Sequence, residues 1–308
     1  MGHFIDGEWT TTRSFADGDG TFRRKATTFR ERVETPEAGR YRLYVSYACP
    51  WAHRTLIARA LLGLEHVFDV AVVHHFMGED GWTFAPGAGV VHDAEGTTLL
   101  RDVYLRADPR FTGRVTVPIL WDTREESIVN NESREIVRMM SDVFRSLGHG
   151  ERDLHPAALH DAIEHAIDAI YEPINNGVYR SGFARTQEAY EAAVSDVFEA
   201  LDRWEGVLGR QRYLAGDQLT EADIFLFTTL VRFDLVYHYH FKCNRRRIQD
   251  YPNLWGFTRE IFQLPGVADT VSFDHITKHY FGSHESVNPT RVVPVGPEID
   301  FRAPHGRG

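Results

Sequence analysis

The sequence predicts a mixed α/β segment followed by an all-helical segment. Between about residues 41 and 145, short apolar runs typical of strands alternate with apolar residues at helical spacing. Beyond about residue 150, the apolar residues recur only at helical spacing. The chain has 308 residues, which is enough for two domains of ordinary size.

Composition narrows the class of protein and its partners. Hydrophobic residues make up 43% and charged residues 25%, as in folded globular proteins. The formal charge of −10 argues against nucleic acid or an anionic membrane as a partner. The only cysteines, Cys49 and Cys243, form neither a disulfide framework nor a zinc-binding spacing, which favours a reducing compartment. With no apolar signal core and no membrane-spanning run, we expect a cytoplasmic protein.

The mixed segment opens with a polar stretch. Residues 1–40 are broken by glycines and a proline, which predicts an irregular extension. Residues 41–46 read as a strand, and the apolar spacing of residues 52–61 reads as a helix. A buried strand at residues 67–73 is followed by a Gly- and Asp-rich insertion at about residues 75–112.

A proline interrupts the next predicted strand. Residues 115–122 have strand character but contain Pro118, which cannot donate to a ladder. The strand is therefore at an edge of the sheet, or Pro118 is cis. A short strand at residues 128–129 and a helical stripe at residues 136–144 complete this segment.

The second segment predicts helices and then a tail. Amphipathic patterns cover residues 154–170, 189–208 and 224–235. The third helix has a start signal, with Thr220 as its cap and Asp223 three residues later reaching back. After about residue 285, four prolines predict an extended or mobile tail.

Cys49 lies where the first predicted strand gives way to a helix. Pro50 suits the first helical position, and the free N–H groups there favour a thiolate. A dithiol oxidoreductase would carry a second cysteine at position 52, where this chain has Ala52. A mixed disulfide on Cys49 would therefore be resolved by an external thiol. Cys49 also fits a small buried hydrophobe, and His53 and Arg54 either add positive charge or face solvent.

The order of these features resembles the cytosolic glutathione transferases, and specifically the glutathionyl-hydroquinone reductases of the Xi class. The resemblance runs from about residue 40 to 295 and rests on Cys-Pro-Trp-Ala-His-Arg at 49–54, Gly-Trp-Thr-Phe at 81–84, residues 115–122, Asn-Asn-Glu-Ser-Arg-Glu-Ile at 130–136, residues 174–179, Gly-Phe-Ala at 182–184, and His-Phe-Lys-Cys-Asn at 240–244. It implies an N-terminal extension (1–40), a thioredoxin-like thiol-binding domain (41–148), an all-helical glutathione transferase domain that binds the second substrate (149–285), and a tail (286–308). It also implies a homodimer.

The resemblance implies a glutathione site. Pro118 would be cis and would turn the backbone of Val117 toward the cysteinyl part of glutathione. Glu132 and Ser133 would meet the γ-glutamyl end, where a helix start suits a carboxylate and Glu132 suits an ammonium. Trp82 and Arg114 match family positions that flank the tripeptide. The guanidinium of Arg114 suits the glycine carboxylate. Other roles remain open: Ser133 or Asn131 as an N-cap, Trp82 as a core aromatic residue, and Arg114 as a surface charge.

The resemblance also implies a hydroquinone site. Three tyrosines match the family's hydroquinone-binding positions, Tyr179, Tyr237 and Tyr280. A phenol can donate a hydrogen bond to a quinol oxygen, although Tyr239 remains an alternative to Tyr237. We expect Cys243 to be a buried structural residue. His238 and His240 alternate with aromatic residues, a spacing that would suit a pair of metal ligands. No third ligand is evident, so we expect core or surface histidines and no metal.

The expected function is therefore reduction of glutathionyl-hydroquinones by a thiol, either glutathione or a related γ-glutamyl thiol. Cys49 would take up the glutathionyl group as a mixed disulfide, and a second thiol would release it. One alternative is an Omega-like thiol transferase or dehydroascorbate reductase that uses the same cysteine. Another is a non-catalytic interaction module of the same fold, which would not need a reactive cysteine.

Overall fold

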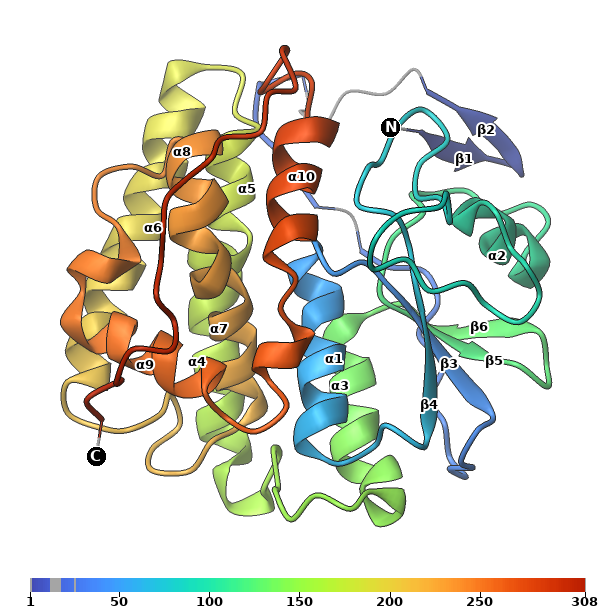
Figure 1. Ribbon diagram of the computed structural model, residues 1–308, viewed down its shortest axis with the longest axis horizontal. Coiled ribbons are helices and arrows are strands. Elements are labelled where there is room, and N and C mark those ends of the chain that lie inside the picture. Colours follow the sequence, from blue (N-terminus) through green and yellow to red (C-terminus); the bar gives the residue numbers. More distant parts are fainter. Residues whose placement is uncertain (1, 12–17, 25, 308) are drawn as a thin grey trace. The chain divides into compact units, whose positions relative to one another are not determined.

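The computed structural model describes residues 2–11, 18–24 and 26–307 (Figure 1). These residues group into two compact units. The first unit contains the described residues up to 11, Ala26–Arg152 and Thr270–Ser283; the second contains residues 18–24, Asp153–Asp269 and the chain from His284 onward. Among the described residues, no helix is both long and apolar enough to cross a membrane.

A four-stranded mixed sheet forms the centre of the first unit. Its strand order is β4-β3-β5-β6, with β3 and β4 parallel and the other neighbouring pairs antiparallel. Helices α1 and α3 pack together beside the sheet (Figure 1). The bounds are β3 Tyr41–Val45, α1 Pro50–Leu61, β4 Phe68–Val72, β5 Ile119–Asp122, β6 Ser127–Asn130 and α3 Ser133–Asp142. These elements confirm the predicted strands and helices to within a few residues.

Pro118 takes the second of its two predicted arrangements. Strand β5 pairs with β3 on one side and β6 on the other, so it is not an edge strand. The Val117–Pro118 peptide bond is cis, and β5 begins only after it, at Ile119. The proline therefore needs no place in the ladder.

Two features of the first unit were missed by the pattern analysis. A hairpin of β1 (His3–Ile5) and β2 (Glu8–Thr10) lies in the predicted irregular extension. Its turn, Asp6–Gly7, has positive φ at both residues, which is the backbone that tight hairpins favour. Helix α2 (Leu100–Ala107) lies in the predicted insertion and contacts β6. Strands of three residues are too short to show periodicity.

Helix α10 (Phe273–Ser283) groups with the first unit, although it follows the helical segment in sequence. Hydrogen bonds hold it to the insertion: His279 Nδ1 lies 2.8 Å from the His75 carbonyl oxygen, and the Met77 amide donates to Ser283 Oγ. This grouping by contacts differs from the contiguous helical domain expected at 149–285, whose boundaries remain a prediction.

Helices build the second unit. Their bounds are α4 His160–Ile170, α5 Gly177–Gly182, α6 Gln187–Leu208, α7 Glu221–Arg232, α8 His238–His240 and α9 Pro252–Phe262. The predicted helix at 154–170 begins later, since Pro156 precedes a short 3₁₀ turn at Ala157–Leu159. The predicted helix at 224–235 passes at Phe233–Tyr237 into a wider π turn.

The predicted start of α7 is confirmed. Asp223 accepts hydrogen bonds from the backbone amide and hydroxyl of Thr220 at 2.8 and 3.0 Å, and from the Leu214 amide at 2.7 Å. Full burial raises the pKa of Asp223 to about 6, against the effect of these hydrogen bonds. The carboxylate thus fixes the loop before α7 as well as the helix itself.

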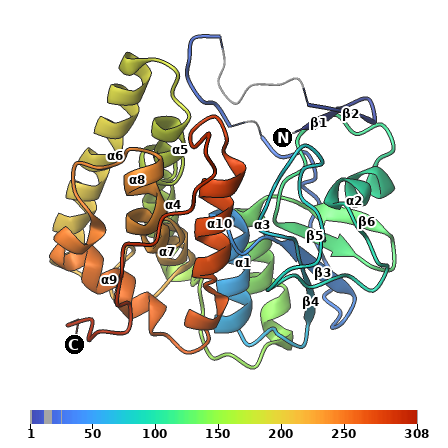
Figure 2. The ribbon, with the colours of Figure 1, turned by 45° about the horizontal axis from the view of Figure 1, so that its top comes forward.

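The tail is extended, as predicted, and its end is anchored. Residues 287–307 form no helix or strand, and the tail runs past α8 to end beside α9 (Figures 1 and 2). The ring of Phe301 packs against Trp255 and Phe262 of α9. Gln263 donates to two carbonyl groups of the tail, at Phe301 and Ala303.

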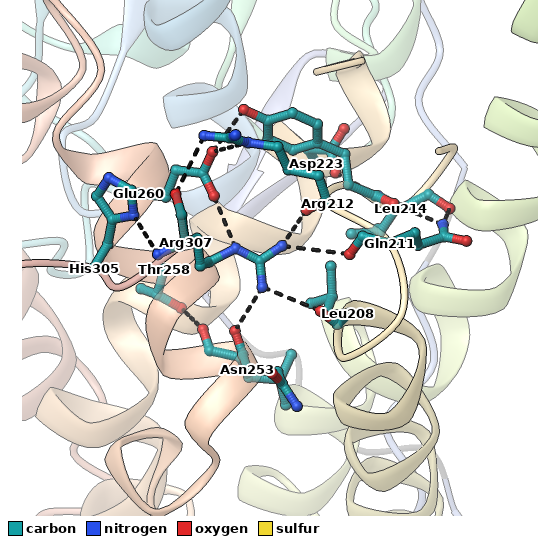
Figure 3. A network of polar contacts seen from close by, with 12 residues as sticks. Leu208, Gln211, Arg212, Leu214, Asp223, Asn253, Thr258, Glu260, His305 and Arg307 are labelled. Carbon is teal, nitrogen blue, oxygen red and sulfur yellow. Dashed lines mark hydrogen bonds and ion pairs between the residues drawn. The ribbon is translucent and has the colours of Figure 1, made fainter. Parts of the chain in front are cut away.

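Glu260 ties the end of the tail to the helices (Figure 3). Its buried carboxylate accepts hydrogen bonds from Arg212 Nε at 2.8 Å, the Tyr213 hydroxyl at 2.7 Å and Arg307 Nε at 2.8 Å. Arg307 also donates to backbone carbonyls at Leu208 and Arg212. Burial opposes ionisation of Glu260, but the three donors hold its pKa below the usual range.

Glu260→Gln should lower the free energy of unfolding by about 2–3 kcal/mol, because two arginines lose their carboxylate. The pKa of Glu260 is lower in the folded state than in the unfolded chain. The stabilisation that Glu260 provides is therefore complete above the ordinary glutamate pKa of about 4.3, and it is lost as the pH falls through the lowered pKa of the folded state. Urea unfolding at pH 7 and pH 3 measures the difference. Glu285→Gln, which removes an exposed ion pair with Arg291, is the control and should change stability by less than about 0.5 kcal/mol.

Candidate functional site

Cys49 is the N-cap residue of α1, with Pro50 at the first helical position. Its backbone is extended, with φ −77° and ψ 120°, and its side chain is partly exposed. Its Sγ atom lies 3.5 Å from the carbonyl oxygen of Val117. The sulfur therefore lies at the start of a helix, as the sequence predicts, and also against the cis-proline loop.

Glu132 and Ser133 begin helix α3, and the structure settles which of them caps it. Glu132 is the N-cap: its carboxylate accepts from the Arg134 amide at 3.3 Å and from the Thr27 hydroxyl at 3.3 Å. Ser133 is the first helical residue and is buried, and its Oγ accepts from Arg54 at 3.3 Å. The alternative in which Ser133 or Asn131 is the N-cap is wrong.

His53 and Arg54 are both buried, which overturns the interpretation that they face solvent. His53 Nε2 lies 2.8 Å from the Thr270 hydroxyl. The guanidinium of Arg54 lies 4.3 Å from the centre of the Trp51 ring and also reaches Ser133. A buried cation thus links the helix that begins at Cys49 to the start of α3.

Tyr104, which sequence reasoning missed, joins the two loops of this site. Its hydroxyl donates to the Thr116 carbonyl at 2.9 Å and accepts from the Thr116 amide and from Asn131 Nδ2, both at 3.1 Å. Thr116 precedes Val117, and Asn131 precedes Glu132. Burial raises the pKa of Tyr104, so the phenol stays neutral and keeps its donor. Tyr104 lies on α2, inside the insertion, where no pattern marked it.

Trp82 and Arg114 lie in the same unit. Trp82 is 6% exposed, and its ring stacks on His279 of α10, with 4.8 Å between ring centres and an interplanar angle of 24°. Arg114 is half-buried and follows Gly113, which bridges to Phe4 of β1. The hairpin missed by sequence reasoning thus adjoins the segment that carries Arg114.

The three predicted tyrosines divide between the units. In the second unit, Tyr179 of α5 and Tyr237 have ring centres 5.9 Å apart, and the Arg24 guanidinium lies 5.1 Å from the Tyr179 ring. Tyr237 is fully buried, whereas Tyr239 is 72% exposed. In the first unit, Tyr280 of α10 is 1% exposed and follows His279.

The second cysteine, the buried histidines and the potential metal ligands are not among the residues predicted for the site. Cys243 is fully buried, and burial raises the pKa of its thiol to about 12, which suits the structural role expected of it. His240 is buried, with its Nε2 3.2 Å from His284 Nδ1. Within the described part of the chain, three potential metal ligands come within 4.8 Å of one another only at His155, Glu164 and Glu221.

Comparison with known proteins shows the family to which the chain belongs. Residues 48–143 match the family model described as glutathione S-transferase, N-terminal domain, and residues 187–260 match the corresponding C-terminal domain. The chain is 50% identical to glutathionyl-hydroquinone reductase YqjG of Escherichia coli, over 100% of this chain and 98% of that protein. The chain belongs to the Xi class of glutathione transferases. The predicted fold, a thioredoxin-like segment followed by a helical one, is thereby confirmed.

Solved Xi-class structures share the fold over nearly the full length. The Xi-class protein of Natrialba magadii has a TM-score of 0.95 and 53% identity, covering 100% of this chain and 96% of that one. The glutathione-bound structure of YqjG has a TM-score of 0.90 and 51% identity, covering 99% of each chain. A Schizosaccharomyces pombe protein named glutathione S-transferase omega-like 2 is 46% identical over 94% of this chain and 97% of its own length.

Tyr104→Phe should lower the free energy of unfolding by about 1–2 kcal/mol and weaken glutathione binding several-fold, because both loops lose a shared anchor. Calorimetric titration with glutathione and urea unfolding measure the two effects. The control is Tyr251→Phe, which removes a single phenol hydrogen bond, to Asp202 in the second unit. An unchanged glutathione affinity in Tyr104→Phe would show that Tyr104 has no part in shaping the site.

Proposed function

We propose that this chain is a glutathione-dependent reductase that removes glutathione from glutathionyl-hydroquinones. The observation that carries the proposal is Cys49 at the N-cap position of α1, with its sulfur 3.5 Å from the Val117 carbonyl and Ala52 in place of a resolving cysteine. It occurs in a chain half identical to a glutathionyl-hydroquinone reductase.

The reaction proceeds by thiol exchange at Cys49. The thiolate attacks the thioether sulfur of the glutathionyl-hydroquinone, forming an S–S bond as the bond between sulfur and the ring carbon breaks. The electron pair stays on the ring, which takes up a proton and leaves as hydroquinone. A second glutathione thiolate then attacks the mixed disulfide, giving oxidised glutathione and restoring Cys49. The two glutathione sulfurs that end in the disulfide each give up one electron, and these two electrons reduce the ring.

Glutathione is held by residues of the first unit in this proposal. The backbone of Val117, after which Pro118 is cis, pairs with the cysteinyl part. The γ-glutamyl carboxylate meets Ser133 and the N-terminus of α3, and its ammonium meets Glu132. Trp82 flanks the tripeptide, and Arg114 binds the glycine carboxylate. The burial of Ser133 beside Arg54 supports this assignment, because a cation near the helix start favours an anionic ligand.

Hydroquinone recognition is assigned to Tyr179, Tyr237 and Tyr280, whose phenols would donate to the ring oxygens as these gain charge. The pairing of the Tyr179 and Tyr237 rings, and the exposure of Tyr239 to solvent, support Tyr237 over Tyr239. An Omega-like thiol transferase or dehydroascorbate reductase is the second candidate, favoured by the relative named glutathione S-transferase omega-like 2. We also infer a cytoplasmic location, since Cys49 and Cys243, the two cysteines of the sequence, do not form a disulfide framework.

Cys49 should alkylate with a pH midpoint well below the free-cysteine pKa of about 8.5, because the helix start stabilises its thiolate. Iodoacetamide labelling followed by mass spectrometry measures the midpoint, and incubation with oxidised glutathione should add one glutathionyl group at Cys49. Cys49→Ser should lose both the adduct and the activity, while Cys243→Ala keeps them. A midpoint at or above 8.5 would contradict the thiolate argument.

Tyr237→Phe and Tyr280→Phe should each slow reduction of a glutathionyl-hydroquinone about 10- to 100-fold, the loss typical of one hydrogen bond to a charged group. Exchange with a small aliphatic mixed disulfide should barely change, since that substrate has no ring to hold. Steady-state kinetics on both substrates, with Tyr251→Phe as the control, test this. Equal losses on both substrates would assign the tyrosines a structural role, and no loss on either substrate would mean that the hydroquinone site is placed wrongly.

The family further suggests a homodimer. Light scattering at micromolar concentration should give about twice the 35.3 kDa chain mass. A single species at the chain mass would rule the dimer out at that concentration.

A further inference from the structure

Helix α10 carries two neighbouring residues that bear on the proposed site. His279 stacks on Trp82, with 4.8 Å between ring centres and nearly parallel planes. Tyr280 follows it directly, and both are buried. Trp82 comes from the insertion, almost two hundred residues earlier in the chain. The ring of His279 therefore covers one face of the Trp82 indole.

A hydrogen bond fixes the plane of the His279 ring. Its Nδ1 atom lies 2.8 Å from the His75 carbonyl oxygen. A carbonyl oxygen only accepts, so Nδ1 carries the proton. The ring can then neither flip nor tilt away from Trp82 without losing a partly buried hydrogen bond. His75 itself is held neutral, since burial and then the neighbouring His74 lower its pKa to about 4.

Two further contacts tie the insertion to α10 on either side of Trp82. The Met77 amide donates to Ser283 Oγ at 3.0 Å, and His275 Nε2 lies 2.7 Å from the Ala88 carbonyl oxygen. The loop that carries Trp82 is thus held along about two turns of the helix. His275 makes a T-shaped ring contact with Tyr47 and, like His279, a hydrogen bond from a ring nitrogen to a backbone carbonyl, so it serves as a control.

We propose that His279 is the positioning residue for Trp82, and that α10 thereby sets the affinity for glutathione. This rests on the proposed function, in which Trp82 flanks glutathione. With 6% of its surface exposed, Trp82 offers a ligand only a narrow edge, so a small rotation of the indole removes that contact. Because Tyr280 adjoins His279, the same helix also carries a residue assigned to the hydroquinone.

Two substitutions separate the parts played by the ring and the hydrogen bond. His279→Asn keeps a donor near Nδ1 but removes the stacked ring, and should weaken glutathione binding about 3- to 10-fold, the range of one aromatic pair. His279→Phe keeps the ring but loses the donor, and should weaken binding less. The rate at saturating glutathione on a small mixed disulfide should stay within about twofold of wild type, because Cys49 is untouched.

A double-mutant cycle shows whether His279 acts through Trp82. If it does, His279→Asn should have little further effect on glutathione affinity in a Trp82→Ala background, or in Trp82→Leu if the alanine variant fails to fold. Calorimetric titration of the full chain with glutathione gives the affinities. His275→Phe should leave the affinity unchanged while costing similar stability in urea.

Additive effects of the His279 and Trp82 substitutions, or an equal loss of affinity in His275→Phe, would overturn the proposal. So would wild-type affinity in His279→Asn. A wild-type chain that binds glutathione but does not reduce glutathionyl-hydroquinones would refute the proposed function while the cycle still decides the role of His279. A wild-type chain that does not bind glutathione would refute both.

Discussion

The N-terminus of α1 is the constraint on which the candidate site depends. A helix leaves its first N–H groups without intrahelical partners and places partial positive charge at its start. Cys49 occupies that position, and Pro50 loses nothing there because its missing N–H would be unpaired in any case. Everything else in the proposed thiol site has to be brought to this sulfur from other parts of the chain.

Buried polar side chains bring those parts together. Arg54 reaches from α1 to Ser133 at the start of α3, and Tyr104 holds both the loop before Val117 and the loop before Glu132. A buried polar group is costly unless its hydrogen bonds are made, so each of these residues favours one arrangement of the loops over others. The site is therefore shaped by groups that need not touch the substrate.

In the second unit, buried polar side chains also fix the backbone around them, but outside the candidate thiol site. Asp223 and Glu260 are both buried carboxylates surrounded by donors, yet their pKa values move in opposite directions. Asp223 receives only neutral donors, so burial prevails; Glu260 receives two arginines, which outweigh it. The result is a fixed start for α7 in one case and an anchored chain end in the other.

Periodicity and residue chemistry determined the order of the main elements, the place of Cys49 at a helix start and the cap of α7, because these depend on neighbours within one turn of helix. The family motifs added the cis-proline at Val117–Pro118. Tyr104, the burial of His53 and Arg54, the N-terminal hairpin and the contact of His279 with Trp82 were decided only by the tertiary structure. Their partners are distant in sequence or their segments too short to carry a period, so no local pattern distinguishes them from surface residues.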